Sequence, residues 1–270
     1  MAKRKRFSAF QKGIHSSPKR EFSLPDPDRP KRVLLSWSGG KDSSLALTAL
    51  RADERFEVAG LITTVTADYD RVSIHGVRRA LVSEQARLAG LRLWEVVIPA
   101  AASNAEYEAA FLGGLAQVRY DEPDISHVAF GDLFLADIRE YRESLVAGTG
   151  FSPLFPLWEI DTTELAHRFI SAGYEAYLVC VDTEQLDASF AGRKFDESFL
   201  ADLPAGIDPC GERGEFHTFV TSGPCLNGRV EHSIGETVFR DGRFSYTDIV
   251  ERDATLVAQT HQKAHYAIND

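Results

Sequence analysis

A run of glycines and hydroxyl side chains near the start of the chain has the composition of an anion-binding turn. It reads Ser36-Trp37-Ser38-Gly39-Gly40-Lys41-Asp42-Ser43-Ser44, between an apolar stretch and a helix-forming one. The glycines permit a tight turn with outward-facing amides, and the dipole of the following helix adds positive potential. Lys41 supplies a cation for phosphate, and Asp42 could hold Mg²⁺ or fix the turn. The run therefore predicts a phosphate site.

This turn does not match the Walker P-loop, whose pattern is G-x-x-x-x-G-K-[ST]. Leu35 stands where the first glycine should be, and Asp42 occupies the Ser or Thr position. The Walker interpretation is therefore excluded. The alternative to a phosphate site is an ordinary strand-to-helix turn with incidental Ser and Lys.

A second chemically dense stretch, residues 206–220, reads GIDPCGERGEFHTFV. Its Glu212 and Glu215 form a carboxylate pair that could bind ammonium, take a proton from it or hold a metal. The alternative is a solvated loop with one ion pair. Cys210 is either a nucleophile or a small buried residue, and His217 has no second metal ligand at helix or turn spacing.

Five apolar runs alternate with helix-forming segments and must position these residues. The expected strands are 33–37, 58–65, 93–98, 127–130 and 177–181. The alternation predicts a three-layer α/β sandwich with a five-stranded parallel sheet, and ligands of such sheets bind beyond the carboxyl ends of the strands. The glycine turn, Thr63-Thr64 and Gly131-Asp132 would then lie around one crevice.

The strongest helix signal precedes residues 104–120. Ser103 and Glu106 form a capping-box pattern, in which each side chain satisfies a backbone amide of the other residue. The pattern predicts that a long helix begins directly after Ser103.

The end of the chain has a different residue pattern from the part in which strands and helices alternate. Residues 228–250 have the pattern of short antiparallel strands, with Asp241-Gly242 as the hairpin turn. This predicts a small C-terminal module with antiparallel strands, packed over the edge of the parallel sheet.

Charge is unevenly distributed along the 270 residues, whose net charge is −10. Residues 1–32 hold ten basic and three acidic side chains and carry +7, so the remainder carries −17. An acidic body disfavours nucleic acid as a partner. No apolar run approaches the ~20 residues that span a bilayer, so no membrane association is expected. Three scattered cysteines fit a reducing, cytoplasmic setting.

The glycine turn resembles the PP-loop of the N-type ATP pyrophosphatases, part of the adenine nucleotide alpha hydrolase-like superfamily. Members cleave ATP between the α and β phosphates and adenylate a carbonyl or carboxyl oxygen, which a nitrogen or sulfur nucleophile then attacks. The resemblance implies ATP, Mg²⁺ and a Rossmann-like fold of the HUP type.

Residues 206–220, followed by Gly223-Pro224, resemble the P-C-G-E-x-G-E-x-x-T-F-V…G-P signature of the diphthine–ammonia ligase family. Ile74-His75, Phe130-Gly131-Asp132 and the PLFPLW stretch at 153–158 add to the resemblance. It covers roughly residues 32 to 225.

The resemblance implies a set of site residues, and the composition of the chain implies its division. The catalytic residues would be Lys41, Asp42, Glu212 and Glu215, and Mg²⁺ would be held by Asp42 and Asp132. The nucleotide would contact Ser36, Ser38, Gly39, Gly40, Lys41, Asp42, Ser43, Ser44, Thr63, Thr64, His75, Gly131 and Asp132. Residues 1–31 would be a disordered basic tail, 32–203 the PP-loop domain, and 204–270 the substrate or acceptor module.

One feature separates this chain from the family name. Diphthine occurs only on the translocation factor of archaea and eukaryotes, whereas the Ala- and Arg-rich composition with a single Met resembles a high-GC bacterial gene. The resemblance therefore implies the chemistry and leaves the acceptor open.

The expected function is an AMP- and pyrophosphate-forming ligase that adenylates a small-molecule or protein carboxylate for attack by ammonia or an amine. Ammonia would come from solution or from an ammonia-producing protein. The chain could also form a homodimer. The alternatives are a nucleotide-binding sensor without turnover and a PP-loop enzyme that modifies RNA, which the acidic body disfavours. Residues 183–195 are a candidate lid, with Arg193 and Lys194 reaching pyrophosphate.

Overall fold

The computed structural model describes residues 29–73 and 76–252. The tail expected to be disordered therefore lies, up to residue 28, outside the described residues, as does His75. The first strand begins at Lys31, close to where the apolar pattern of the sequence starts.

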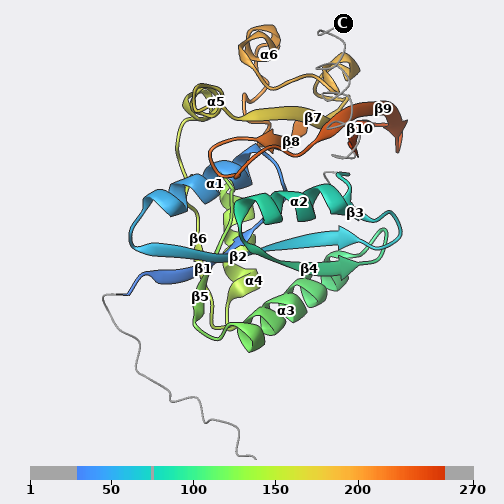
Figure 1. Ribbon diagram of the computed structural model, residues 1–270. Helices are drawn as coiled ribbons and strands as arrows, with labels where there is room; N and C mark the ends of the chain where they lie inside the picture. Colours follow the sequence, from blue (N-terminus) through green and yellow to red (C-terminus); the bar gives the residue numbers. More distant parts are fainter. Residues whose placement is uncertain (1–28, 74–75, 253–270) are drawn as a thin grey trace, which may run out of the picture.

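A mostly parallel sheet forms the centre of the first part of the chain (Figure 1). Its parallel strands lie in the order β4-β2-β1-β5-β6, and the short β3 pairs antiparallel with the end of β2. The bounds are β1 Lys31–Ser36, β2 Phe56–Thr66, β3 Arg71–Val72, β4 Arg92–Ile98, β5 Ile125–Ala129 and β6 Ser152–Leu154. The chain order reverses at β1, which is the switch point where such sheets bind ligands.

Helices cover both faces of this sheet because successive side chains of a strand point to opposite faces. Leu35 of β1 packs in a core with α1 (Lys41–Ala52) and α2 (Arg79–Ala89), whereas its neighbour Leu34 packs in a second core with α3 and α4. Helix α3 spans Asn104–Asp121 and α4 spans Ala136–Val146. The predicted three-layer sandwich is confirmed.

The predicted capping box at the start of α3 is present. Ser103 Oγ accepts a hydrogen bond from Glu106 N at 3.3 Å, and Glu106 Oε2 accepts one from Ser103 N at 2.9 Å. The local sequence was sufficient here because both partners lie within one helical turn.

A second sheet has four antiparallel strands in the order β8-β7-β10-β9. Figure 1 shows α1 and α2 between this sheet and the central one. The strands are β7 Glu175–Asp182, β8 Phe216–Ser222, β9 His232–Arg240 and β10 Phe244–Glu251. The hairpin expected at Asp241-Gly242 joins β9 to β10, with both turn residues at positive φ.

The prediction that residues 177–181 form the fifth parallel strand is wrong. These residues belong to β7 of the antiparallel sheet, and the fifth parallel strand is β6. The error has a physical reason: β7 is buried on both faces, so its continuous apolar run resembles a central parallel strand. Strand β6 has three residues including Pro153, too short a run to predict. The domain boundary after residue 203 stays a prediction.

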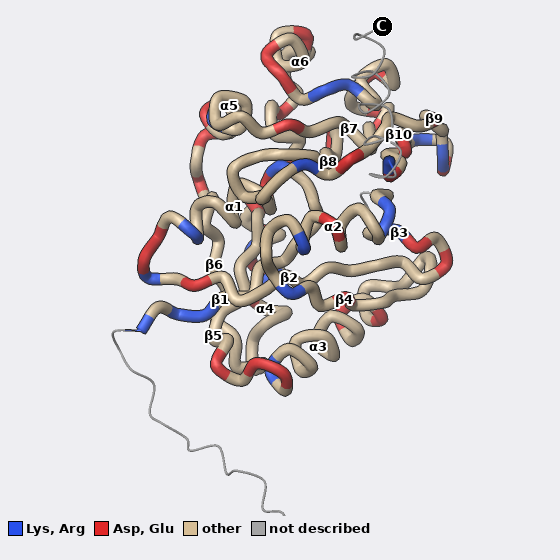
Figure 2. The backbone as a smooth tube through the Cα atoms, viewed as in Figure 1, with Lys and Arg blue, Asp and Glu red and all other residues tan. Residues whose placement is uncertain are grey.

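Three short helices complete the described chain: α5 Thr162–Ser171, the 3₁₀ turn Ala188–Phe190 and α6 Glu197–Asp202. No helix among the described residues has the length and apolar character needed to cross a bilayer. Basic and acidic positions are interspersed along the described chain (Figure 2). This mixed distribution contrasts with the basic stripe that is typical of nucleic-acid binding.

Candidate active site

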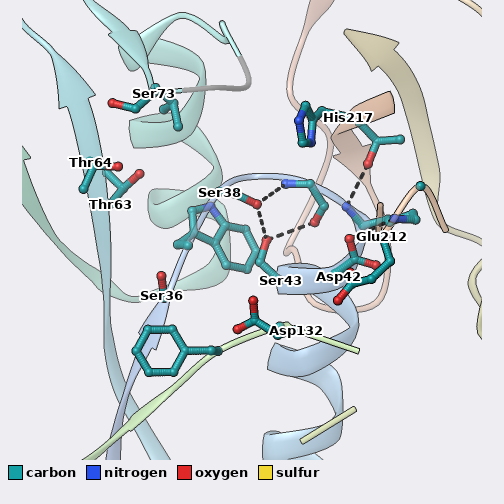
Figure 3. A pocket seen from close by; sticks show the side chains of 18 of the residues that line it. Ser36, Ser38, Asp42, Ser43, Thr63, Thr64, Ser73, Asp132, Glu212 and His217 are labelled. Carbon is teal, nitrogen blue, oxygen red and sulfur yellow. Dashed lines mark hydrogen bonds and ion pairs between the residues drawn. The ribbon is translucent and has the colours of Figure 1, made fainter. Parts of the chain in front are cut away.

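A pocket of about 280 Å³ opens where β1, β2 and β5 end, between the central sheet and the loop that precedes β8. Figure 3 shows side chains from all these elements facing one another across it. The structure thus brings together the glycine turn, Thr63-Thr64 and Gly131-Asp132, together with Glu212. Gly131 allows this close approach, because an added Cβ would lie 3.1 Å from the backbone of Asp42.

Most of the predicted site residues line the pocket, and a few lie behind it. The lining members are Ser36, Ser38, Gly40, Lys41, Asp42, Ser43, Thr63, Thr64, Gly131, Asp132 and Glu212. Gly39, Ser44 and Glu215 are outside the lining, and His75 is outside the described residues. The buried Ser44 hydroxyl donates a hydrogen bond to Gly40 O at 2.9 Å, so it is turned into the helix.

The glycine turn is held from behind by a side chain that no motif includes. Gln85 Nε2 donates to Gly39 O at 3.0 Å, and Gln85 Oε1 accepts from Trp37 Nε1 at 2.9 Å. Gly39 has φ +80°, and an added Cβ would lie 2.7 Å from Gln85 Oε1. Both conformation and space therefore require glycine at this position.

The N-terminus of α1 faces the pocket, as the anion-site prediction requires. Gly40 is the N-cap residue, and it has no side chain of its own that could cap the helix. Lys41 N donates to Thr218 Oγ1 of β8 at 3.0 Å, so the second sheet contacts the turn directly. Ser38 and Ser43 hydroxyls lie 3.4 Å apart at the mouth of this helix. An amide-rich helix N-terminus of this kind attracts phosphate.

Lys41 and Asp42 form an ion pair within the pocket wall. Lys41 Nζ lies 2.8 Å from Asp42 Oδ2 and 5.7 Å from the centre of the Phe216 ring, and the lysine side chain is only 3% exposed. Burial acts to lower the pKa of Lys41, but the Asp42 carboxylate holds it above its ordinary value. Lys41 is therefore a fixed, paired cation in the pocket wall.

Three buried polar atoms of the pocket wall have no hydrogen-bond partner among the described residues: Asp42 Oδ1, Thr63 Oγ1 and Arg142 Nε. Buried polar groups in folded proteins are almost always bonded, so such a group needs an explanation. Here all three belong to side chains that line one pocket, in which a polar ligand would be a partner for them.

The charges of the pocket bear on Mg²⁺. Among the described lining residues, the carboxylates are Asp42, Asp132 and Glu212, and the cations are Lys41 and Arg142. A polyphosphate would therefore enter an acidic site and would need a further cation. No group of three His, Cys, Asp or Glu among the described residues is close enough to hold a metal alone. Asp42 and Asp132 would thus bind Mg²⁺ jointly with phosphate oxygens, which is the usual mode for this ion.

Asp132 itself is partly desolvated. Its Oδ2 lies 3.8 Å from Arg142 Nε, and burial raises the pKa of Asp132 while Arg142 opposes the rise. The Arg142 guanidinium also lies over the Phe130 ring, 5.1 Å from its centre. Arg142 thereby contacts both the Phe130 ring and the Asp132 carboxylate in the lining of the pocket.

The loop at 208–215 is held together by its own carboxylates. Glu215 is 1% exposed, and its two oxygens accept hydrogen bonds from Asp208 N at 3.1 Å and Arg213 N at 2.9 Å. Asp208 Oδ1 in turn accepts from Cys210 N at 2.8 Å. The geometry gives Glu215 a framework position behind the pocket, where the sequence predicts a catalytic one.

Glu212 is the carboxylate of this loop that faces the pocket (Figure 3). Its Oε1 accepts a hydrogen bond from Leu133 N at 2.7 Å. Burial raises the pKa of Glu212 to about 7, and the nearby Asp42 charge adds to the rise. A carboxylate that titrates near neutral pH is suited to accept and donate protons.

Neighbouring candidates have other surroundings. Burial raises the pKa of the Cys210 thiol to about 12, and Sγ donates to Thr162 O at 3.3 Å, which favours the buried-residue alternative over a nucleophile. Burial and Lys41 lower the pKa of His217 to about 4, so its imidazole is neutral at pH 7. Arg193 pairs with an acid outside the pocket.

Sequence reasoning missed Gln85, Thr218 and Arg142. Gln85 offered one signal: it occupies the apolar face of its helix, four residues after Leu81 and three before Leu88, both buried. Thr218 offered another, because it is the threonine of the signature at 209–220, to which no role was assigned. Arg142 offered none, because this helix position reaches the pocket only through tertiary packing.

Comparison with known proteins gives matches over most of the described chain. Residues 31–152 match the family model described as the diphthamide synthase N-terminal domain, and residues 161–253 match the one described as its C-terminal domain. A diphthine–ammonia ligase of Schizosaccharomyces pombe is 27% identical over 135 residues. That alignment covers 46% of this chain and 22% of the relative, so the chain spans a minor part of that protein's length.

Proposed function

This chain belongs to the diphthamide synthase family, and from that premise we propose that it is an ATP-dependent ligase that forms an amide. It would adenylate a carboxyl or carbonyl acceptor and pass it to ammonia or an amine, releasing AMP and pyrophosphate. The observation that carries the proposal is that three buried polar atoms without a hydrogen-bond partner belong to side chains lining the pocket that contains the N-terminus of α1.

In the first half-reaction an acceptor oxygen attacks the α-phosphorus of ATP, and the bond to pyrophosphate breaks. The Ser38 and Ser43 hydroxyls at the N-terminus of α1, with the helix dipole, would stabilise the charge that develops on the pyrophosphate. The Lys41 ammonium adds a positive charge that its pairing with Asp42 keeps in place. Mg²⁺ held by Asp42 and Asp132 would supply charge neutralisation at the phosphates.

In the second half-reaction ammonia attacks the acyl carbon, the bond to AMP breaks and one proton is released. Glu212 is suited to receive that proton at the carboxylate oxygen that Leu133 N does not occupy. Because its pKa is about 7, it is part ionised at neutral pH and can return the proton to solvent.

The acceptor would lie in a second pocket of about 370 Å³, which shares Val72 and Ser73 with the first. The β9–β10 hairpin supplies one of its walls, including Arg240 and Tyr246. The two shared residues support an acceptor that enters from the hairpin side and presents its carboxyl group to the nucleotide.

The test is pyrophosphate release, measured against a panel of carboxylates with ammonium and Mg-ATP. We expect AMP and pyrophosphate in equal amounts, and about a 100-fold slower rate for Lys41→Ala. Lys31→Ala, which removes an exposed lysine at the far end of β1, is the matched control and should retain the wild-type rate. Steady ADP formation would contradict the proposal. Tight ATP binding without turnover on any acceptor would favour a nucleotide sensor instead.

A further inference from the structure

Gln85 is a completely buried amide in α2, with 0% of its side chain exposed. Both of its N–H donors and one of its two acceptor directions are used. Its Oε1 accepts from Trp37 Nε1 at 2.9 Å, and its Nε2 donates to Gly39 O at 3.0 Å and to Val220 O at 2.6 Å. Two of the three partners, Trp37 and Gly39, belong to the glycine turn, and the third, Val220, belongs to β8. Gln85 of α2 therefore links the turn to the second sheet.

The Gly39 carbonyl is the group that this arrangement controls. It accepts one hydrogen bond from Gln85 Nε2 and another from Val220 N at 2.9 Å. Both donors lie outside the pocket lining, as Gly39 itself does, so this carbonyl points away from the pocket. An anion site built from backbone amides works only while neighbouring carbonyls point elsewhere, since their negative ends repel phosphate.

Because residue 39 is a glycine, its carbonyl does not keep this outward direction without hydrogen-bond partners. A glycine peptide unit rotates with little steric cost, and Gly39 already has φ +80°. A flip of the peptide after Gly39 would replace the Gly40 amide, which donates to the pocket-lining Ser38 Oγ at 3.3 Å, with the Gly39 carbonyl. Two fixed donors on the carbonyl oppose this flip.

We propose that Gln85 is a positioning residue for the phosphate site: it holds the Gly39 carbonyl outward and, through Val220, ties that setting to the second sheet. The inference rests on the proposed function only in that the turn binds the β and γ phosphates of ATP. A side chain that merely filled the core would need no amide here, because burying an amide is unfavourable unless it is fully bonded.

The experiment measures binding of two nucleotides by calorimetry, with Mg²⁺ present. One is α,β-methylene-ATP, which cannot be cleaved between the α and β phosphates, and the other is AMP, which lacks the phosphates that the turn would hold. Gln85→Glu keeps the length and the acceptor for Trp37 but places a carboxylate oxygen against two carbonyls. We expect Gln85→Glu to weaken binding of the ATP analogue about 30-fold and that of AMP less than about 3-fold.

Two further variants complete the design. Gln85→Met keeps the length without charge and guards against misfolding of Gln85→Glu, and it should show the same selectivity with about a 10-fold loss. Gln117→Glu makes the same substitution on the exposed face of α3 and should bind both nucleotides as wild type does.

The outcomes separate this inference from the proposed function. Equal losses for both nucleotides would mean that Gln85 merely supports the fold, and no loss would mean that the turn keeps its conformation without it; either overturns the inference. If the wild type binds the ATP analogue and Gln85→Glu does so selectively worse, the inference stands even where no acceptor yields AMP. If the wild type binds neither nucleotide, both proposals fall.

Discussion

The turn at 36–44 and the loop at 208–215 face the same pocket but hold their backbones in opposite ways. The first depends on distant partners: Gln85 and Val220 bind its Gly39 carbonyl. The second is bonded largely within itself, since Glu215 accepts from backbone amides two and seven residues away. Glycines and carboxylates in a sequence therefore mark both loops as unusual, but only the bonding pattern separates framework groups from groups that are free to meet a ligand.

The difference has an energetic consequence. A substitution in the self-bonded loop exposes buried amides and should reduce the stability of the fold. A substitution in the turn leaves most of the fold intact and should change affinity for phosphate. Each prediction below tests one side of this contrast.

Glu215→Ala should have the largest effect of these substitutions, and the effect should be a loss of stability. It leaves the amides of Asp208 and Arg213 buried without an acceptor, which we expect to lower the free energy of unfolding by about 3 to 4 kcal/mol. Urea denaturation followed by fluorescence measures this. Glu236→Ala on the exposed face of β9 is the control, with a change within about 0.5 kcal/mol. An unchanged midpoint together with lost turnover would instead return Glu215 to the catalytic role that the sequence predicts.

Gly40→Ala should act on the other loop, and mainly on affinity. Its Cβ would lie 2.9 Å from the Thr218 carbonyl oxygen, so the turn and β8 must separate. We expect about 30-fold weaker binding of the ATP analogue, with a stability loss of about 1 to 3 kcal/mol. Calorimetry with the purified variant measures the affinity.

Gly113→Ala is the matched control for this glycine. The residue lies in α3, and an added Cβ there meets nothing within 4 Å. It should bind nucleotide normally and gain about 0.5 to 1 kcal/mol of stability. If Gly40→Ala also binds normally, the turn is more plastic than its contacts indicate, and the contrast between the two loops weakens.

The two loops also differ in how much of their structure the sequence predicts, because local patterns can be recognised in a sequence and contacts between distant residues cannot. The turn, the capping box at Ser103 and the alternation of strands with helices are local patterns, and the structure contains all three. The role of Gln85 follows from contacts with residues 46 and 135 positions away, which no local pattern encodes. Glu212 and Glu215 have the same residue type in the same motif, so the sequence has no means of telling which one is already bonded to backbone amides.

Glu212→Gln should change stability in a way that depends on pH. The pKa of Glu212 in the folded protein, about 7, lies above its ordinary value of 4.5. The folded state therefore holds this proton more tightly, and the stability it contributes is complete below pH 4.5 and is lost as the pH rises through 7. Glutamine mimics the protonated form, so the variant should match the wild type near pH 4.5.

At pH 8 the same variant should exceed the wild type by about 1 to 2 kcal/mol, after allowance for solvent screening. Urea denaturation at both pH values measures the difference, with Glu236→Gln as the exposed control. A variant less stable than wild type at pH 8 would show that the Glu212 charge is not desolvated. The pocket-facing carboxylate would then resemble the framework ones, and the contrast within this loop would disappear.

The smallest effects belong to Arg193→Ala and Lys194→Ala, the cations that the sequence places in a lid. Arg193 pairs with Asp202 at 2.8 Å and Lys194 with Glu175 at 3.4 Å, and neither lines the pocket. Exposed pairs of this kind contribute little, so we expect stability within about 0.5 kcal/mol of wild type and ATP-analogue affinity within about 2-fold. A loss above 10-fold in calorimetry would mean that residues 183–195 close over bound phosphate. The loop at 183–195 would then supply positive charge to the site, and the positioning of the turn by Gln85 would be only one part of nucleotide binding.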